Sequence, residues 1–198
     1  MRRRVRWFLG LAGSLGVLGL AAGLSAVTGV DPRAHRGTPY HAATLRRLAA
    51  PTALSPTSTG PLRAGFARVR LTPTLGAAAD APERGEFRAL PLAGFGSRRG
   101  RPAEGVLDEL WVRAIALSVG AQTHVLVGAD ALIVPREVSE AAAARIQAET
   151  GLTRGQVYFG ATHTHGSLGG WGEGWVAEAF AGGYQPGVRA WFAGQLAA

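Results

Sequence analysis

Two histidines separated by one residue are the strongest chemical signal in the chain. His163 and His165 follow residues 157–162, whose β-branched and aromatic side chains predict a short strand. Side chains two residues apart face the same way in an extended backbone, so both imidazoles would leave the strand end together, with Thr162 and Thr164 on the other side. Two converging imidazoles are half of a first-row metal site, and zinc suits them best. The alternative is a pair of surface histidines in a flexible loop.

Glycine-rich segments accompany this pair. Gly166, Gly169 and Gly170 follow the histidines and leave little side-chain bulk around them. Residues 92–100 form a second glycine-rich loop, whose spacing is not GxGxxG and which no helical pattern follows, so a dinucleotide site is not indicated. Gly94 and Gly96 are candidate pocket residues in that loop. An ordinary surface loop is the alternative interpretation.

A β-hairpin is predicted for residues 110–119 and 123–129, joined by a turn at 120–122. Asp130 lies where the second strand ends. An acid at this position can hold a metal-bound histidine in place, or it can cap a turn, and both interpretations stand. His124, inside the second strand, is predicted to be a packed core residue and not a ligand.

The remaining elements are read from periodicity and end signals. Residues 65–71 alternate as a strand does, and residues 135–149 predict a helix with Pro135 in its first turn and Gly151 at its end. A short helix is predicted at 175–180, and an amphipathic helix begins at Pro186. Residues 76–90 read as irregular.

The N-terminus predicts export. Four arginines within residues 1–6 precede residues 7–30, an uncharged run of 24 residues that is long enough to cross a bilayer. A signal anchor and a signal peptide cleaved near 21–26 are both open, and both place the arginines in the cytoplasm and the rest outside it. Residues 31–61 contain five prolines among Thr, Ser and Gly and predict a tether with at most a turn or two of helix at 44–50. The predicted parts are therefore a signal anchor or signal peptide (1–30), a tether (31–61) and a folded region (62–198).

Composition excludes two classes of function. The chain has no cysteine, which excludes disulfides and thiolate metal sites. All 21 of its basic Lys or Arg residues are arginine, and the net charge is +8, half of which comes from the N-terminal arginines. The other arginines are scattered among acids without interleaved aromatics, so no nucleic-acid surface is indicated.

With these residues in order, the chain resembles the amino-terminal catalytic region of the neutral/alkaline ceramidase family from about Ala64 onward. The order and spacing of five segments carry the resemblance: Ala64–Pro73 (AGFARVRLTP), Leu92–Gly96 (LAGFG), Gly105–Ala114 (GVLDELWVRA), Val127–Asp130 (VGAD) and Ala161–Gly166 (ATHTHG). Two positions depart from the family pattern. Arg70 stands where the family usually has an acid, and Gly166-Ser167-Leu168 stands where it usually has Ser-Gly-Pro.

The resemblance implies an α/β domain of mixed β-sheets with flanking helices, and a zinc ion held by two histidines, a glutamate and a tyrosine. His163 matches the first histidine ligand, and His165 matches a catalytic histidine that hydrogen-bonds substrate or an oxyanion. The other ligands lie downstream in the family, so we expect this chain to be the N-terminal part of a zinc-dependent amide hydrolase. Its substrate would be a lipid amide of the N-acylsphingosine class at a membrane surface, reached through residues 7–30. The alternative is a non-catalytic, membrane-tethered envelope module that retains part of the fold.

Overall fold

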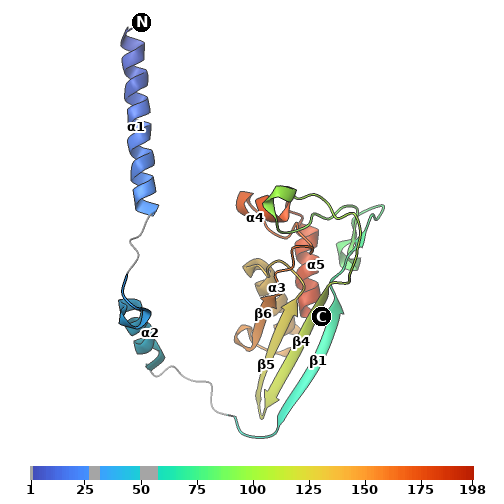
Figure 1. The fold of residues 1–198 in the computed structure, drawn as a ribbon. Helices are drawn as coiled ribbons and strands as arrows, with labels where there is room; N and C mark the ends of the chain where they lie inside the picture. The colour runs from blue at the N-terminus through green and yellow to red at the C-terminus, as the bar shows by residue number, and fades with distance from the viewer. Residues whose placement is uncertain (1, 27–31, 50–57) are drawn as a thin grey trace. The chain divides into compact units, whose positions relative to one another are not determined.

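The computed structural model describes residues 2–26, 32–49 and 58–198 of the chain. The chain divides into two compact units, Met1–Thr57 and Ser58–Ala198, and each is described by itself (Figure 1). The predicted boundary between tether and folded region, at residues 61 and 62, lies close to this division.

Helices make up the described part of the first unit. Helix α1 covers Arg2–Ala26, the 3₁₀ helix η1 covers His35–Gly37 and helix α2 covers Pro39–Ala49. The turn or two of helix predicted within the tether is part of α2, a longer helix that has 11 residues and begins at a proline, the residue whose fixed φ suits the first helical position.

The structure gives no support to the predicted membrane-spanning helix. Among the described residues, no helix is both long enough and apolar enough to cross a membrane. Four of the first five residues of α1 are arginines, which shortens its apolar part. The last four residues of the predicted span, 27–30, lie outside the described residues.

A four-stranded mixed sheet organises the second unit. Its strands are β1 (Leu62–Arg70), β4 (Trp111–Val119), β5 (Gln122–Ala129) and β6 (Val157–Ala161), in the order β1-β4-β5-β6. The pairs β1·β4 and β4·β5 are antiparallel and β5·β6 is parallel. The predicted hairpin is present, with a tighter turn than expected, because Val119 pairs with Gln122 and Gly120 takes a left-handed φ of 55°.

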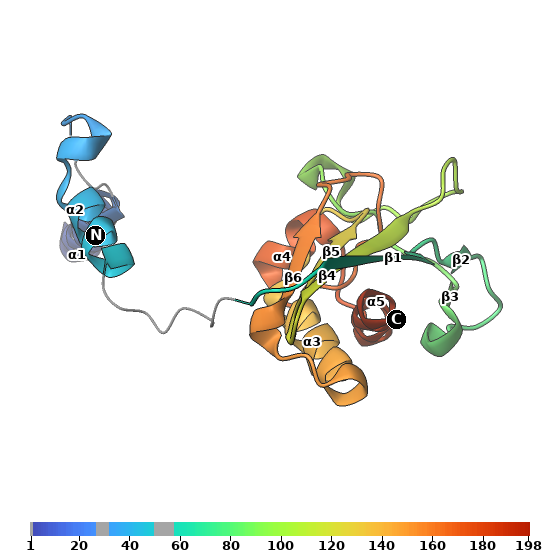
Figure 2. The same ribbon diagram turned by 90° about the horizontal axis from the view of Figure 1, so that it is seen from below.

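Helices α3 (Arg136–Thr150) and α5 (Pro186–Ala197) pack against each other and cover one face of the sheet (Figure 2). Helix α3 ends at Gly151, whose left-handed φ of 77° explains the glycine predicted there. Helix α4 (Trp175–Ala181) lies near the glycine-rich loop. The core joins sheet and helix side chains, among them Val112, Val127, Val157, Val138 and Phe192.

The opposite face of the sheet carries a row of exposed apolar side chains. One residue from each strand stands in register across the sheet: Phe66, Ile115, Leu126 and Tyr158. Their exposed fractions are 77%, 38%, 47% and 67%. His124, two residues before Leu126, shares this face and is exposed, so its prediction as a core residue was wrong.

A small lobe covers residues 74–90, of which the sequence predicts 76–90 as irregular. It contains β2 (Thr74–Leu75) and β3 (Glu86–Phe87), paired in parallel, and the 3₁₀ helix η2 (Pro82–Arg84) between them. The Phe87 ring packs edge-on against Trp191 of α5, with the two ring centres 5.8 Å apart. This contact fixes the lobe to the core.

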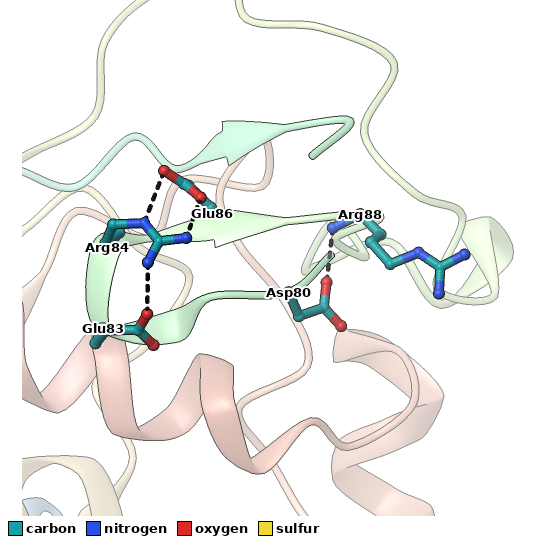
Figure 3. A network of polar contacts seen from close by, with 5 residues as sticks. All are labelled: Asp80, Glu83, Arg84, Glu86 and Arg88. Atoms are coloured by element: carbon teal, nitrogen blue, oxygen red, sulfur yellow. Dashed lines mark hydrogen bonds and ion pairs between the residues drawn. The ribbon is translucent and has the colours of Figure 1, made fainter. Parts of the chain in front are cut away.

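Polar contacts close the lobe (Figure 3). Arg84 donates two hydrogen bonds to the Glu86 carboxylate, at 3.1 and 2.9 Å, and one to Glu83 at 3.0 Å. The hydrogen bond from Arg84 lowers the pKa of Glu86. Asp80 accepts a bond of 2.7 Å from the backbone N–H of Arg88 and so ties the segment before η2 to the segment after β3.

Candidate active site

The two histidines lie just beyond the end of β6. Backbone hydrogen bonds between this segment and the end of β5 continue past the last paired residues of the two strands. Thr162 N donates to Ala129 O, and Thr164 N donates to Ala131 O, each at 3.0 Å. The side-chain hydroxyls of Thr162 and Thr164 bond to each other at 2.6 Å. The loop therefore leaves the sheet edge on a fixed backbone path.

The imidazoles of His163 and His165 meet with ring centres 4.9 Å apart and planes at 73°. The sequence predicts that they converge through an extended backbone, and that geometry was wrong. His163 has a φ of 62°, in the left-handed region, so a local kink brings the rings together.

Backbone strain is concentrated at this place. Among the described non-glycine residues, only Phe95, Arg99 and His163 have a positive φ, at 47°, 51° and 62°. Phe95 contacts His165, and Arg99 belongs to the same glycine-rich loop. Such conformations cost about 1–3 kcal/mol each and gather at functional sites, where the surrounding contacts hold them.

His163 is held in one ring orientation. Its Nδ1 lies 2.9 Å from the carbonyl oxygen of Leu132, which can only accept, so Nδ1 is the donor. In the neutral ring the lone pair then belongs to Nε2. Metal-binding histidines usually have this arrangement, with the second ring nitrogen bonded to a carbonyl or carboxylate.

His165 lies under the glycine-rich loop. Its ring centre is 4.4 Å from that of Phe95, and a Cβ at Gly94 would come within 2.5 Å of its Nδ1. Gly94 has a φ of 80° and donates its N–H to Phe180 O at 2.7 Å. The Nδ1 of His165 is buried and has no hydrogen-bond partner in the described part of the chain. A buried polar atom of this kind indicates a site that is completed by another group.

Arg98, which sequence reasoning missed, clamps the same place. Its Nη1 donates to the backbone carbonyl of His165 and, at 3.4 Å, to that of Ala93. The guanidinium lies 4.8 Å from the centre of the Phe95 ring. No spacing rule links residue 98 to residue 165, so only the fold could reveal this contact.

The structure brings Gly94 to the histidines and gives Gly96 and Asp130 other neighbours. Gly96 begins the 3₁₀ helix η3 (Gly96–Arg98), and a Cβ there would meet Ala179 O at 3.5 Å. The Asp130 carboxylate accepts from Trp111 N at 3.0 Å and from Arg113 at 2.9 Å. These bonds tie the end of β5 to β4, as an acid that caps a strand end does.

The two imidazoles fit a zinc site as part of its ligand set. His163 presents a pre-oriented Nε2, and the buried Nδ1 of His165 beside it has no partner within the chain's described residues. Those residues include no group of three or more His, Cys, Asp or Glu that could hold a metal ion. Tight zinc sites use three or four protein ligands, so His163 would hold zinc together with groups that these residues do not supply.

A cavity of about 410 Å³ adjoins the histidine loop. Thr164, Gly166 and Ser167 of the loop form part of its wall, and Arg98 forms another part. Most of the remaining lining is apolar, and includes Leu75, Leu90, Leu92, Val106, Leu107, Leu110 and Leu168. The cavity is thus mostly apolar, with polar residues such as Thr164 and Arg98 in its wall, and neither His163 nor His165 is among its lining residues.

No model of a known protein family matches the chain, and no curated protein matches it. Solved structures do match, and two of them are ceramidases. The neutral ceramidase from Pseudomonas aeruginosa superposes with a TM-score of 0.57 at 20% identity, over 69% of this chain and 20% of that one. A ceramidase complexed with C2 superposes with a TM-score of 0.56 at 22% identity, over the same shares.

This chain shares its fold with part of the neutral ceramidases. The shared part amounts to about a fifth of those chains. The mixed α/β architecture that the sequence resemblance implies is therefore confirmed. Activity, substrate and metal belong to the whole enzyme, and for this chain they are proposals.

Proposed function

We propose that residues 62–198 form the histidine-bearing part of a ceramidase-like, zinc-dependent amide hydrolase. The observation that carries the proposal is the pairing of His163 and His165. One ring is fixed through Leu132 O, and the other is half-buried, with a buried Nδ1 that has no partner among the described residues. A fold shared with neutral ceramidases supports it.

The two histidines would have different roles. His163 would hold the metal through Nε2, and bound zinc supplies Lewis-acid polarisation and a water of lowered pKa. His165, 4.9 Å away, would hydrogen-bond the substrate or an oxyanion, or move a proton. Phe95 and Gly94 cover this ring and limit the access of water to it.

The proposed substrate is a lipid amide of the N-acylsphingosine class. The cavity of about 410 Å³ beside the histidine loop supports this choice, because a hydrocarbon chain needs an apolar pocket and most of this lining is apolar. A substrate of this kind resides at a membrane surface. We also propose that the folded region works outside the cytoplasm. The arginines before an uncharged N-terminal run support that location.

Calorimetric titration of the purified full chain with Zn²⁺ tests the metal role. We expect weak binding that His163→Ala removes, because His163 alone supplies fewer protein ligands than a tight site needs. His124→Ala is the matched control, since this histidine is exposed on the far face of the sheet. Equal binding by His163→Ala and the unchanged chain would refute the role given to His163.

A non-catalytic envelope module is the second candidate. The engagement of Asp130 by Trp111 and Arg113 favours it, because that carboxylate is not directed to the histidines as a further ligand. Hydrolysis of a fluorescent N-acylsphingosine in mixed micelles separates the two. Activity that zinc stimulates and His165→Ala abolishes supports the hydrolase, whereas activity that survives His165→Ala contradicts the role of this residue.

A further inference from the structure

Ser167 is a buried serine that follows the two histidines at the place where the chain departs from the ceramidase pattern. Its exposed fraction is 0%. Its hydroxyl donates to Thr164 O at 2.7 Å and accepts from Leu132 N at 3.1 Å. Both capacities of the hydroxyl are thus used by backbone groups from two different segments.

These bonds lead directly to His163. The N–H of Leu132 donates to Ser167 Oγ, and the carbonyl of Leu132 accepts from His163 Nδ1 at 2.9 Å. Thr164, whose carbonyl accepts from the serine, is the residue after His163. Ser167 therefore bonds to the residue whose carbonyl orients the imidazole and to the residue that follows His163.

The serine also ties the loop over His165. Its carbonyl accepts the N–H of Ala93 at 3.0 Å, and the next residue, Gly94, packs against the His165 ring. This second tie uses the backbone of Ser167, so a side-chain substitution leaves it in place. The hydroxyl can for this reason be tested separately from the loop contact.

We propose that Ser167 is a positioning residue that sets the orientation and tautomer of His163 through Leu132. The role in metal binding rests on the proposed function, whereas the effect on the ring itself does not. The Ser167 hydroxyl bridges residues 132 and 164 by its two hydrogen bonds. Groups that orient a metal-bound histidine typically change metal affinity about 10–100-fold when they are removed.

The test uses the full chain without metal and the variant Ser167→Ala. Nitrogen-15 NMR of the histidine rings at mildly alkaline pH distinguishes the two neutral tautomers, and His163→Ala assigns the signal. We expect one tautomer, with the proton on Nδ1, in the unchanged chain and a mixture in Ser167→Ala. An unchanged single tautomer in a folded Ser167→Ala overturns the proposal.

Two further variants control for folding. Ser139→Ala removes another buried serine hydroxyl, which donates to Arg136 O inside α3, and we expect it to leave the His163 ring unchanged. Ser167→Thr keeps the hydroxyl and should restore the single tautomer. If Ser167→Ala does not fold, a folded Ser167→Thr with mixed tautomers overturns the proposal.

Zinc titration supplies the second readout. We expect Ser167→Ala to bind zinc at least 10-fold more weakly than Ser139→Ala, because orienting groups typically contribute that much to affinity. If no variant binds zinc but the tautomer follows Ser167, the proposed function fails and the positioning role stands. A mixture of His163 tautomers in Ser139→Ala as well would show that any loss of a buried serine hydroxyl disturbs the ring, and would overturn the positioning role of Ser167.

Discussion

Gly94 and His165 are in contact so close that only a glycine fits. A Cβ at residue 94 would lie 2.5 Å from Nδ1 and 2.6 Å from Cγ of the imidazole. Gly94 also has a φ of 80°, which favours glycine. The glycine-rich loop therefore depends on this residue to cover the histidine.

The substitution Gly94→Ala should displace the His165 ring and destabilise the fold. Backbone strain and overpacking each cost about 1–3 kcal/mol, so we expect a loss of about 2 kcal/mol or more in the free energy of unfolding. Denaturant unfolding measures it. Gly105→Ala is the control, because a Cβ there meets nothing within 4 Å, and an equal loss in both variants would contradict the argument.

Zinc binding by this chain should weaken as the pH is lowered. A metal and a proton compete for the same lone pair on Nε2 of His163, so binding releases protons and acid opposes it. Calorimetry at several pH values, in buffers of different ionisation enthalpy, counts the protons released. Binding that is independent of pH between neutral and acid solution would show that the imidazoles are not the ligands.

The sequence predicted most elements of the second unit because each has local signals. Strands β1, β4, β5 and β6 and helix α3 lie within a few residues of their predicted bounds, and Gly151 ends α3 as expected. Helix α2 was missed in part because its pattern begins at a proline, in a segment rich in prolines. Residues 76–90 look irregular in the sequence, and β3 among them was missed because its ladder with β2 is non-local.

The candidate site was only partly readable. The His-x-His spacing located the pair, and Gly94 was a candidate from composition. The kink at His163, the bond to Leu132 and the clamp by Arg98 depend on loop paths that no periodicity encodes. His124 was misplaced because strand alternation does not tell which face of a sheet the helices will cover.

The exposed apolar row on the sheet should limit solubility without adding to stability. Phe66 and Tyr158 are 77% and 67% exposed, so Phe66→Thr with Tyr158→Thr should raise solubility and reduce binding of a hydrophobic dye. The free energy of unfolding of the doubly substituted protein should differ from that of the unchanged chain by about 1 kcal/mol or less. Leu71→Ala, at a residue with 0% exposure, should cost about 2–5 kcal/mol. A comparable cost for the double substitution would mean that the row is buried in solution.

Export of the folded region is testable with reporters fused after Ala64. An alkaline phosphatase fusion should be active, because the arginines before the uncharged run keep the N-terminus inside and direct the residues after that run outward. Substitution of the four arginines by glutamates is the matched control and should reduce the activity. An inactive phosphatase fusion together with an active cytoplasmic reporter at the same residue would contradict the prediction of export.

Acid should remove the contribution of Glu109 to stability. The Thr72 hydroxyl and then the Arg70 guanidinium, at 2.6 Å, hold the pKa of this carboxyl below its ordinary value of 4.5. A lowered folded-state pKa stabilises the fold above the ordinary value, and the contribution is lost as the pH falls from about 4.5 through the folded pKa.

Melting temperatures from neutral pH down to pH values below the folded pKa of Glu109 measure this effect. The unchanged chain should lose more stability over that range than Glu109→Gln, which cannot ionise at this position. Glu104→Gln, at an exposed glutamate, should follow the unchanged chain. Because the Glu109 carboxyl is exposed, added salt should reduce the difference at neutral pH. Parallel acid profiles for the unchanged chain and Glu109→Gln would show that the contacts with Thr72 and Arg70 contribute nothing to folding.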